Sequence, residues 1–344
     1  MVSEPSPERL SVVVTEKIIS RFEPLLTSGG GDGHQWTFAA DWPKERVGEA
    51  IAAADVLICS TVDEAHARAA KGLRLLHVTG AGYEKIPLEA LNPHVTVANT
   101  FGHGRSIAEH VIMASLMMSR RALVVNREMR DGVWHTVNSD PDLPLQSTLE
   151  GKVLGIVGLG SIGLEVADLA DRFGMQVRAV RRTVGGTKPD FVSRIDPIEG
   201  LPELLAASDV VVVAIPFNDS TRGLIGAEAL GQMKSSGILI NVARGPIVDE
   251  DALFEALSQN RIGGAGIDVW WGDRHDASSP ASRLPFGELD NVVLTPHHSG
   301  HTVQTFEHRA RDISHNISLL AAGKPLINVV REGVVREGAQ TPKT

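Results

Sequence analysis

The feature that most constrains this chain of 344 residues is a glycine-rich turn between a strand pattern and a helix pattern. Residues 153–157 read Val-Leu-Gly-Ile-Val, and Gly158, Gly160 and Gly163 follow at the spacing G-x-G-x-x-G. Gly158 permits a tight turn, Gly160 leaves space for a diphosphate, and Gly163 lets the helix pack closely on the strand. An ordinary glycine-rich turn is the alternative. The strand before it and the helix after it favour a dinucleotide-binding site.

The rest of the chain repeats this alternation of short apolar strands and amphipathic helices. Strands are expected at residues 11–14, 55–59, 73–78, 95–99, 153–157, 176–180, 209–214, 238–242, 264–269 and 291–295. Helices are expected at residues 44–54, 106–130, 163–173, 202–207, 249–258 and 302–322. At roughly 150 residues per domain the length allows two domains. The pattern predicts an α/β fold with doubly wound parallel sheets.

The longest helix pattern, 106–130, carries its own start signal. Ser106 is followed three residues later by Glu109, the spacing of a capping box that satisfies two backbone amides at a helix start. About 25 residues exceed the usual length of a globular helix, so we expect this helix to run between two domains. The polar stretch 138–150 has the composition of a linker, and the polar tail 331–344 is expected to be loosely ordered.

Charge and cysteine content argue against several classes of protein. Lys plus Arg total 33 against 42 Asp plus Glu, and the net charge of -9 makes a nucleic-acid partner improbable. No apolar run approaches the roughly 18 residues of a membrane span. Cys59 is the single cysteine, and the first residues lack the basic and apolar regions of a signal peptide. A cytoplasmic protein without a membrane partner is therefore expected.

Two arginines, Arg181 and Arg182, stand at the end of the strand pattern that follows the glycine turn. An acidic residue at this position binds the ribose 2′-hydroxyl of NAD and repels a 2′-phosphate. Guanidinium groups attract that phosphate, so the pair predicts a preference for NADP. A solvated basic pair that tolerates either cofactor is the alternative.

Three further segments each lie at the carboxyl end of a predicted strand. They are Asn-Val-Ala-Arg244-Gly, Gly-Ile-Asp268-Val-Trp-Trp and Thr-Pro-His297-His298-Ser-Gly. The carboxyl ends of parallel strands share one edge of a sheet, and ligands bind at that edge. We therefore expect Arg244, Asp268 and His297 to converge near the nicotinamide end of a cofactor bound at the glycine turn.

Taken together, these segments resemble the D-isomer-specific 2-hydroxyacid dehydrogenases, a family of glycerate, phosphoglycerate and D-lactate dehydrogenases with formate and phosphite dehydrogenases as relatives. The likeness covers roughly residues 73–328, and the motifs at 214–221 (A-I-P-F-N-D-S-T) and 230–234 (L-G-Q-M-K) extend it. It implies two Rossmann-like domains with an interdomain cleft. A discontinuous substrate domain would comprise 1–103 and 299–330, and an NAD(P)-binding domain 104–298. It also implies a homodimer through the NAD(P)-binding domains, with 133–150 as a contact arm.

The resemblance implies hydride transfer between NAD(P) and C2 of a small 2-hydroxy or 2-oxo acid. Arg244 would bind the carboxylate, because its planar guanidinium matches two oxygens. His297 would exchange a proton with the C2 oxygen, because an imidazole titrates near neutrality. His298 is assigned to packing or to a contact behind the catalytic histidine. With His301 these histidines are not expected to bind a metal, since no acidic ligand or helical spacing accompanies them.

Two aspartates, one at the end of the predicted strand 264–269 and one after it, have different expected roles. Asp273 occupies the position of a family glutamate that hydrogen-bonds the catalytic histidine and raises its pKa; it is one methylene shorter, and a solvated loop acid is the alternative. Asp268 is implied to face the nicotinamide, with a turn-capping acid as the alternative. The other implied cofactor contacts are Ser161, Ile162, Ile215, Pro216, Thr221, Val242 and Gly300.

On the substrate side, Gly80, Ala81 and Gly82 resemble the loop whose backbone amides bind the substrate carboxylate. His103 and Arg105 lie where the chain would cross between domains, and His103 replaces an asparagine of the family. Both are candidate ligands for a second anionic group, which would suit a dianion such as a phosphonate. A loop histidine and a helix-start arginine in solvent are the alternative.

Three other functions compete with this one. The Trp270–Trp271 pair resembles formate dehydrogenases, but those carry glutamine in place of Asp273 and need no proton relay, so formate ranks low. A dehydrogenase of a phosphorus substrate, such as a hydroxyphosphonate or phosphite, is the first alternative. A dinucleotide-sensing corepressor is the non-enzyme alternative, against which the joint presence of arginine, carboxylate and histidine argues.

Overall fold

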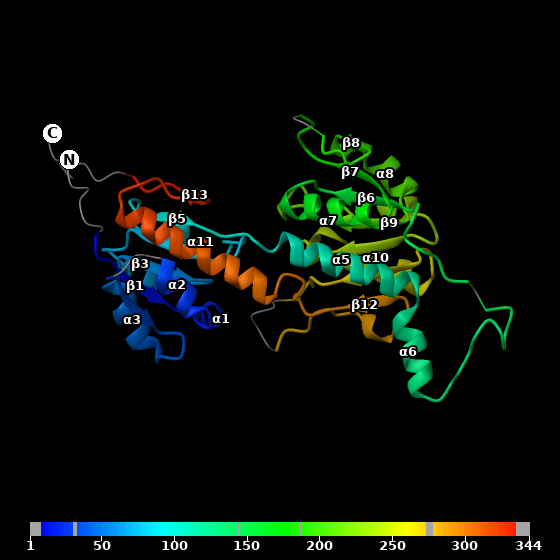
Figure 1. The fold of residues 1–344 in the computed structure, drawn as a ribbon, viewed down its shortest axis with the longest axis horizontal. Coiled ribbons are helices and arrows are strands. Elements are labelled where there is room, and N and C mark those ends of the chain that lie inside the picture. The colour runs from blue at the N-terminus through cyan, green and yellow to red at the C-terminus, as the bar shows by residue number, and fades with distance from the viewer. Residues whose placement is uncertain (1–7, 30–32, 144, 186–187, 273–277, 335–344) are drawn as a thin grey trace. The chain divides into compact units, whose positions relative to one another are not determined.

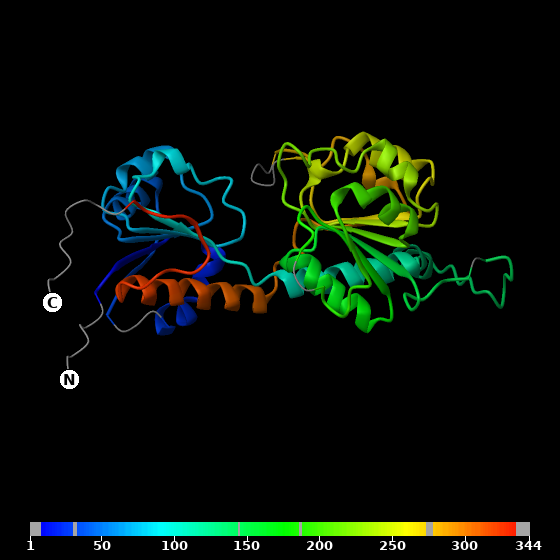
Figure 2. The same cartoon turned by 90° about the horizontal axis from the view of Figure 1, so that it is seen from above.

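The computed structural model describes residues 8–29, 33–143, 145–185, 188–272 and 278–334. The chain divides into a smaller unit, Met1–Gly102 with Thr302–Thr344, and a larger unit, His103–His301. Each unit has one twisted sheet with helices on both faces (Figures 1 and 2). This architecture confirms the predicted α/β fold class with two parallel-sheet domains.

In the described part of the larger unit, seven parallel strands pair in the order β12-β11-β10-β9-β6-β7-β8. Their bounds are β6 Val153–Val157, β7 Gln176–Val180, β8 Arg194–Asp196, β9 Val210–Val213, β10 Ile238–Asn241, β11 Gly264–Ile267 and β12 Val292–Leu294. Every residue of β9 and β10 is buried. Continuous apolar strands of this kind form where helices cover both faces of a parallel sheet.

The helices of the larger unit lie in two layers (Figure 2). Helices α5 Gly104–Ser119 and α7 Ser161–Arg172 pack on one face, and α8 Leu201–Ala207, α9 Ala227–Gln232 and α10 Glu250–Ser258 pack on the other. Helix α6 Ala122–Arg130 follows α5, and short 3-10 turns lie at η2 Ile198–Gly200, η3 Gly245–Ile247 and η4 Phe286–Glu288. The strand order reverses between β6 and β9, and ligands bind at such a reversal in open α/β sheets.

The smaller unit has the strand order β13-β5-β4-β3-β1-β2, in which β13 runs antiparallel and the other strands are parallel. The strands are β1 Ser11–Val14, β2 Gln35–Phe38, β3 Val56–Cys59, β4 Leu75–Val78, β5 Thr96–Ala98 and β13 Val329–Arg331. Helices α1 Lys17–Ser20, α2 Glu23–Gly29 and α11 Val303–Ala321 cover one face. Helices α3 Lys44–Ala52 and α4 Glu64–Ala69, with the 3-10 turn η1 Leu88–Ala90, cover the other.

The prediction of one long helix at 106–130 is wrong in two respects. The chain forms two helices, α5 and α6, because Arg121 takes a left-handed backbone conformation with φ 48° that interrupts a helix. The capping box is also absent. Helix α5 begins at Gly104 with His103 as N-cap, and the Ser106 hydroxyl donates to the carbonyl of Ser299 (2.6 Å).

The strands and helices that the sequence analysis overlooked are short. They are β2, β8, β13, α1, α2, α4 and α9. Arg331, the first residue of the tail that was expected to be loosely ordered, instead ends strand β13. Its guanidinium donates to the carbonyls of Leu88, Asn92 and Val95, which holds β13 on the sheet. Residues 335–344 of that tail lie outside the described residues.

Cys59 ends β3 and is fully buried. Burial, with a smaller contribution from the carboxylate of Glu16, raises the pKa of its thiol to about 12. A thiol with such a pKa stays protonated near neutral pH and is a poor nucleophile. Within the described residues, no helix combines the length and the apolar character that crossing a membrane requires.

Candidate active site

The carboxyl ends of five neighbouring strands lie in register at one edge of the larger sheet. Val157 pairs with Val213, and Val213 with Asn241. Asn241 pairs with Ile267, and Ile267 with Leu294. The glycine turn and the residues Arg244, Asp268 and His297 each follow one of these strand ends within three residues. The fold thus brings the predicted segments to a common edge.

The three glycines of the turn differ in what surrounds them. A side chain on Gly158 (φ 101°) would lie 2.4 Å from the Ile215 side chain, and one on Gly163 would lie 2.2 Å from the Gly158 carbonyl. Nothing lies within 4 Å of the corresponding position at Gly160. Gly158 and Gly163 are therefore required by the packing of the turn itself, whereas Gly160 leaves open space.

That open space lies at the N-terminus of α7. Gly160 is the N-cap of this helix and provides no side-chain hydrogen bond, so the amides of the first turn, from Ser161 and Ile162 onward, are not satisfied by a cap. Unsatisfied amides and the positive end of a helix dipole attract anions. The turn therefore fits the diphosphate of a dinucleotide.

Arg181 and Arg182 follow β7, the neighbour of β6. Arg181 donates from its guanidinium to the Gly185 carbonyl, and its backbone amide donates to the carbonyl of Asp196 (3.1 Å). Its Nε atom is buried and has no hydrogen-bond partner in the described structure. Arg182 is exposed. The two guanidinium groups thus differ: one is tied to its own loop, and the other projects into solvent.

The turn after β9 lies against the glycine turn. Besides the contact of Ile215 with Gly158, the Thr221 hydroxyl donates to the carbonyls of Pro216 (3.0 Å) and Asn218 (3.1 Å). The amide of Asn218 donates back to the same hydroxyl (2.8 Å). Thr221 therefore fixes the shape of the loop that Pro216 begins.

Arg244 lies in a turn that an asparagine stabilises. The Asn241 side chain accepts from the Ala243 amide (3.1 Å) and donates to the Arg244 carbonyl (3.0 Å). The Arg244 guanidinium donates to the Ala243 carbonyl (2.8 Å). Val242, another predicted cofactor contact, is 5% exposed. Arg244 is partly exposed at the end of a strand whose backbone is fixed by Asn241.

Asp268 is buried and holds the segment that carries His297. Its carboxylate accepts from the Thr295 hydroxyl (2.7 Å), the amides of His298 (3.0 Å) and Ser299 (3.1 Å), and the Ser299 hydroxyl. Burial opposes ionisation, but these hydrogen bonds outweigh it and hold the pKa of the Asp268 carboxyl below its ordinary value. Asp268 therefore makes the contacts of an acid that caps a turn, which is the alternative stated for it in the sequence analysis.

His297 has an unusual backbone. Its φ is 57°, in the left-handed region, and its amide donates to the Thr295 carbonyl (3.1 Å). Non-glycine residues that hold such a conformation need support from their surroundings. Its ring is partly exposed and lies near the ring of His301, with 6.5 Å between the centroids. The structure therefore places His297 at the predicted strand end, on a turn that Asp268 holds.

His110 is a residue of this region that the sequence analysis missed. It lies on α5, 3.4 Å from the Thr295 hydroxyl, and its ring meets the His298 ring edge to face at 5.8 Å. Burial lowers the pKa of His110, while Asp268 opposes and His298 reinforces that shift. Its place inside a helix pattern gave no signal in the sequence. His298 is exposed, and its ring contacts that of His110.

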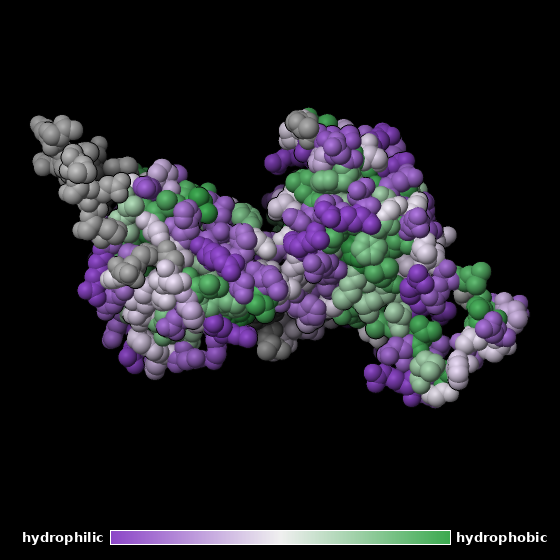
Figure 3. Space-filling view, viewed as in Figure 1, coloured by the Kyte–Doolittle hydropathy of each residue, from purple (hydrophilic) through white to green (hydrophobic). Residues whose placement is uncertain are grey.

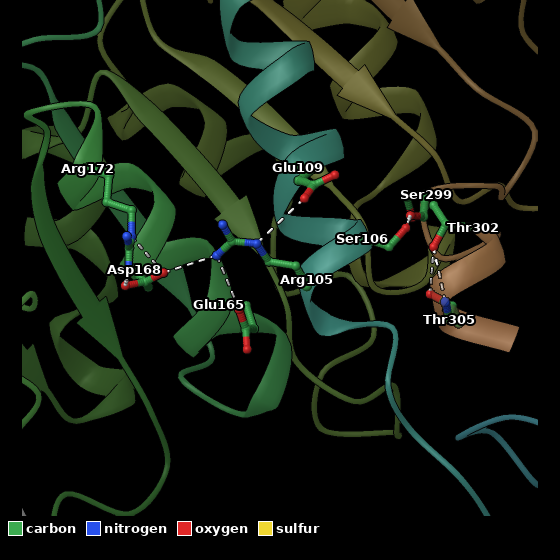
Figure 4. Close-up of polar contacts among 9 residues, drawn as sticks. All are labelled: Arg105, Ser106, Glu109, Glu165, Asp168, Arg172, Ser299, Thr302 and Thr305. Atoms are coloured by element: carbon green, nitrogen blue, oxygen red, sulfur yellow. Dashed lines mark hydrogen bonds and ion pairs between the residues drawn. The ribbon is translucent and has the colours of Figure 1, made fainter. Parts of the chain in front are cut away.

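Arg105 pairs with carboxylates of its own unit (Figure 4). Its guanidinium lies 3.6 Å from Glu109, 3.6 Å from Glu165 and 3.1 Å from Asp168. Asp168 also binds Arg172. These contacts join α5 to α7. They also pair the Arg105 guanidinium, a candidate substrate ligand, with carboxylates of the protein itself.

His103 lies beside Gly300, at the end of the segment that carries His297. A side chain on Gly300 would lie 3.3 Å from the His103 Cβ atom. The Ser106 hydroxyl, one helical turn further on, binds the Ser299 carbonyl. The start of α5 and residues 299–300 are therefore packed together.

In the smaller unit, the predicted carboxylate loop follows β4 and is held by the neighbouring strand β5. Asn99 donates from its side chain to the Ala81 carbonyl (2.7 Å), and the Thr100 amide donates to the Gly80 carbonyl (3.3 Å). Asn99 is 3% exposed, and its Oδ1 atom has no hydrogen-bond partner in the described structure. Its position at the end of the strand beside β4 was a signal that the sequence analysis did not use.

Asp273, the predicted partner of His297, lies outside the described residues. Among the residues that are described, no group of His, Cys, Asp and Glu side chains is arranged to hold a metal ion.

Comparison with known proteins agrees with the geometry. The sequence model of the D-isomer specific 2-hydroxyacid dehydrogenase NAD binding domain matches residues 112–299. A glyoxylate reductase of Korarchaeum cryptofilum is 32% identical over 311 residues, which are 88% of this chain and 90% of that protein. A glyoxylate/hydroxypyruvate reductase A of Arabidopsis thaliana is 32% identical over 286 residues, 83% of this chain and 84% of that one.

A solved structure shows the same fold. It is a D-isomer specific 2-hydroxyacid dehydrogenase from Xanthobacter autotrophicus in complex with NADPH and MES, with a TM-score of 0.74 and 28% identity over 94% of this chain and 98% of that chain. These matches confirm the resemblance seen in the sequence. The chain therefore belongs to the D-isomer specific 2-hydroxyacid dehydrogenase family and is an NAD(P)-dependent oxidoreductase.

Proposed function

We propose that this protein reduces a small 2-oxo acid of the glyoxylate or hydroxypyruvate type to the corresponding 2-hydroxy acid. The observation that carries the proposal is the row of register-paired strand ends, because the turns with Arg244 and His297 follow two of them and the glycine turn follows a third. The substrate class is supported by the names of relatives that match over 88% and 83% of the chain.

The chemistry needs three groups from the larger unit. NAD(P)H, when bound, supplies a hydride for the C2 carbon, and Gly158, Gly160 and Gly163 would hold its diphosphate at the start of α7. The Arg244 guanidinium binds the substrate carboxylate with two parallel hydrogen bonds. The His297 imidazolium gives a proton to the C2 oxygen, and the neutral ring takes that proton back in the reverse direction.

The remaining predicted contacts keep separate roles. Gly80, Ala81 and Gly82 offer backbone amides to the carboxylate, and Asn99 and Thr100 hold that loop. Asp273 favours the protonated His297. His103 and Arg105 remain candidate ligands for a second anionic group, and a bound anion would compete with Glu165 and Asp168 for the Arg105 guanidinium.

We further propose NADP as the preferred cofactor. Arg181 and Arg182 stand at the end of β7, where the adenosine ribose lies in proteins with this motif. Arg182 is exposed and makes no ion pair with the other described residues, so its planar guanidinium can meet a 2′-phosphate. A relative of known structure was solved with NADPH.

A spectrophotometric screen tests the proposed function. Purified protein is mixed with glyoxylate, hydroxypyruvate, pyruvate and a phosphonate-bearing 2-oxo acid, each with NADH and with NADPH. We expect oxidation of the reduced cofactor with one of the first two substrates, and a loss of roughly three orders of magnitude or more in His297→Ala with unchanged cofactor affinity. If the wild-type protein oxidises neither cofactor with any substrate of the panel, the proposed function is wrong and the non-enzymatic corepressor alternative is favoured.

We also propose that the protein is a homodimer, with α6 and the arm 133–150 contacting the second copy. This segment extends away from the sheet of the larger unit (Figure 1), and apolar residues gather on it in the space-filling view (Figure 3). Met129, Trp134 and Leu145 are 56%, 76% and 85% exposed. Solvent exposure of several large apolar side chains on one segment marks an interaction surface. A pocket of about 510 Å³, lined in part by Met117, Met118 and Leu123, lies beside the start of α6.

A further inference from the structure

The adjacent residues Trp270 and Trp271 bind two different turns of the candidate active site. The Trp270 indole N–H donates to the carbonyl of Thr295 (2.8 Å), two residues before His297. The Trp271 indole N–H donates to the carbonyl of Val248 (2.8 Å), just after the 3-10 turn that Arg244 begins. One indole therefore reaches the His297 turn, and the other reaches the Arg244 turn.

The carbonyl that Trp270 binds is the one that shapes the His297 backbone. The amide of His297 donates to this same Thr295 oxygen (3.1 Å). His297 is left-handed, with φ 57°, and a side-chain-bearing residue keeps such a conformation only when neighbouring contacts impose it. Asp268 binds the two amides after His297, and Trp270 binds the carbonyl before it. The turn is thus fixed on both sides.

The backbone of Trp270 also contacts the Arg244 turn. A side chain on Gly245 would lie 2.3 Å from the Trp270 carbonyl oxygen and 2.9 Å from the Trp271 nitrogen. Glycine at 245 therefore allows the Arg244 turn to lie directly on the peptide that joins the two tryptophans. The Arg244 turn and this peptide are therefore in close contact.

The two indole rings rest on a buried aromatic side chain. Trp271 stacks on Phe286, with 5.5 Å between the centroids and 11° between the planes, and Trp270 meets Phe286 edge to face at 6.5 Å. Phe286 is 1% exposed and packs against Phe254. Because interiors are close-packed, this support restricts the motion of both rings.

We propose that Trp270 and Trp271 are positioning residues that fix the His297 turn and the Arg244 turn relative to each other. The catalytic consequence rests on the proposed function, because it takes His297 as the proton donor and Arg244 as the carboxylate ligand. Each indole has its own effect. Trp270 sets the approach of the imidazole and therefore kcat, and Trp271 sets the carboxylate site and therefore KM for the 2-oxo acid.

Phenylalanine variants test this assignment, because they keep an aromatic ring and remove only the indole N–H. We expect Trp270→Phe to lower kcat by between about tenfold and a hundredfold with little change in KM. Trp271→Phe is expected to raise KM for the 2-oxo acid by about tenfold with a smaller change in kcat. Trp36→Phe, in β2 of the smaller unit, is the matched control and should leave both constants unchanged.

Hydrogen exchange of the backbone amides supplies a readout that does not depend on turnover. In Trp270→Phe, amides of residues 297–299 should exchange roughly tenfold faster than in wild type, while those of 153–163 stay unchanged. Wild-type exchange and wild-type kinetics in both variants would overturn the inference and leave the proposed function standing. Faster exchange at 297–299 in a protein without turnover on any 2-oxo acid would overturn the proposed function and leave the structural role of Trp270 in place.

Discussion

His297, the proposed proton donor, has a backbone conformation that its sequence does not reveal. The sequence identifies an imidazole after a proline at a strand end, but the left-handed φ of 57° is a property of the folded turn. Such a conformation costs on the order of 1 kcal/mol or more in an L-residue and has to be imposed. The partners that impose it, Asp268 and Trp270, precede it in the chain by 29 and 27 residues. A contact over that separation has no local sequence signal.

At the same scale, the proposed preference for NADP rests on Arg182. In Arg182→Ser we expect kcat/KM for NADPH to fall by between about tenfold and a hundredfold, because a charge-assisted contact with the 2′-phosphate is lost. The value for NADH should change by less than about threefold, because NADH carries no such phosphate. Steady-state kinetics with both cofactors measure the ratio of kcat/KM for NADPH to kcat/KM for NADH. Arg68→Ser in the smaller unit is the control. An unchanged ratio would favour the alternative that Arg181 and Arg182 are a solvated basic pair that tolerates either cofactor.

His77 is a buried histidine outside the candidate active site. Its Nδ1 atom contacts the Val78 carbonyl (3.1 Å), and its Nε2 atom contacts the Asn316 amide (3.0 Å). Burial lowers its pKa from 6.5 to about 4, although the Val78 carbonyl and the Asp312 carboxylate oppose the shift. The folded protein therefore binds fewer protons at this site than the unfolded chain between these two pH values.

The free energy of unfolding should consequently fall as the pH decreases from 6.5 toward 4. The expected slope from His77 is about 1.4 kcal/mol per pH unit within that window, and above it the contribution is fully present. Urea unfolding of wild type and His77→Gln at several pH values measures it. The variant is less stable overall, but its pH dependence should be shallower by that amount. Parallel slopes in the two proteins would show that His77 does not titrate in this way.

At the scale of the element, glycines in the same turn have separable roles. Gly163→Ala should unfold at a lower temperature, because its Cβ atom would lie 2.2 Å from the Gly158 carbonyl and force the helix off the strand. Gly160→Ala should keep the wild-type Tm, because nothing lies within 4 Å of its Cβ position, and should bind NADPH at least about tenfold more weakly. Thermal unfolding and fluorescence titration separate the two effects. Wild-type NADPH affinity in Gly160→Ala would place the diphosphate elsewhere.

The strands that sequence reasoning found are the buried ones. β6, β9 and β10 lie inside a sheet covered on both faces, so their sequences are continuous apolar runs. β2, β8 and β13 lie at sheet edges, have three or four residues and carry polar side chains, which leaves little pattern to detect. The break between α5 and α6 was missed because Arg121 is compatible with a helix and takes its left-handed φ only in the folded chain.

At the scale of the whole molecule, the homodimer proposal predicts a mass in solution of twice 36.8 kDa. Replacing Met129 and Trp134 together by glutamate should give a monomer, because two charges would be buried in an apolar interface. Val334→Glu, which changes a 67% exposed residue of the smaller unit, should remain a dimer. Light scattering after size-exclusion chromatography distinguishes the two. A dimeric Met129→Glu/Trp134→Glu protein would exclude this segment as the contact.

The sequence by itself determined the fold class and the glycine turn, and it made Arg244 and His297 candidates, because strand periodicity, helix starts and the residues after buried strands are local properties of the chain. The tertiary structure decided which groups act together. It assigned Arg105 to carboxylates on α7, gave Asp268 the amides beyond His297, and brought Trp270 and Trp271 onto the Arg244 and His297 turns. These contacts join segments far apart in sequence, and only the packing of neighbouring strands and helices brings them within hydrogen-bonding distance.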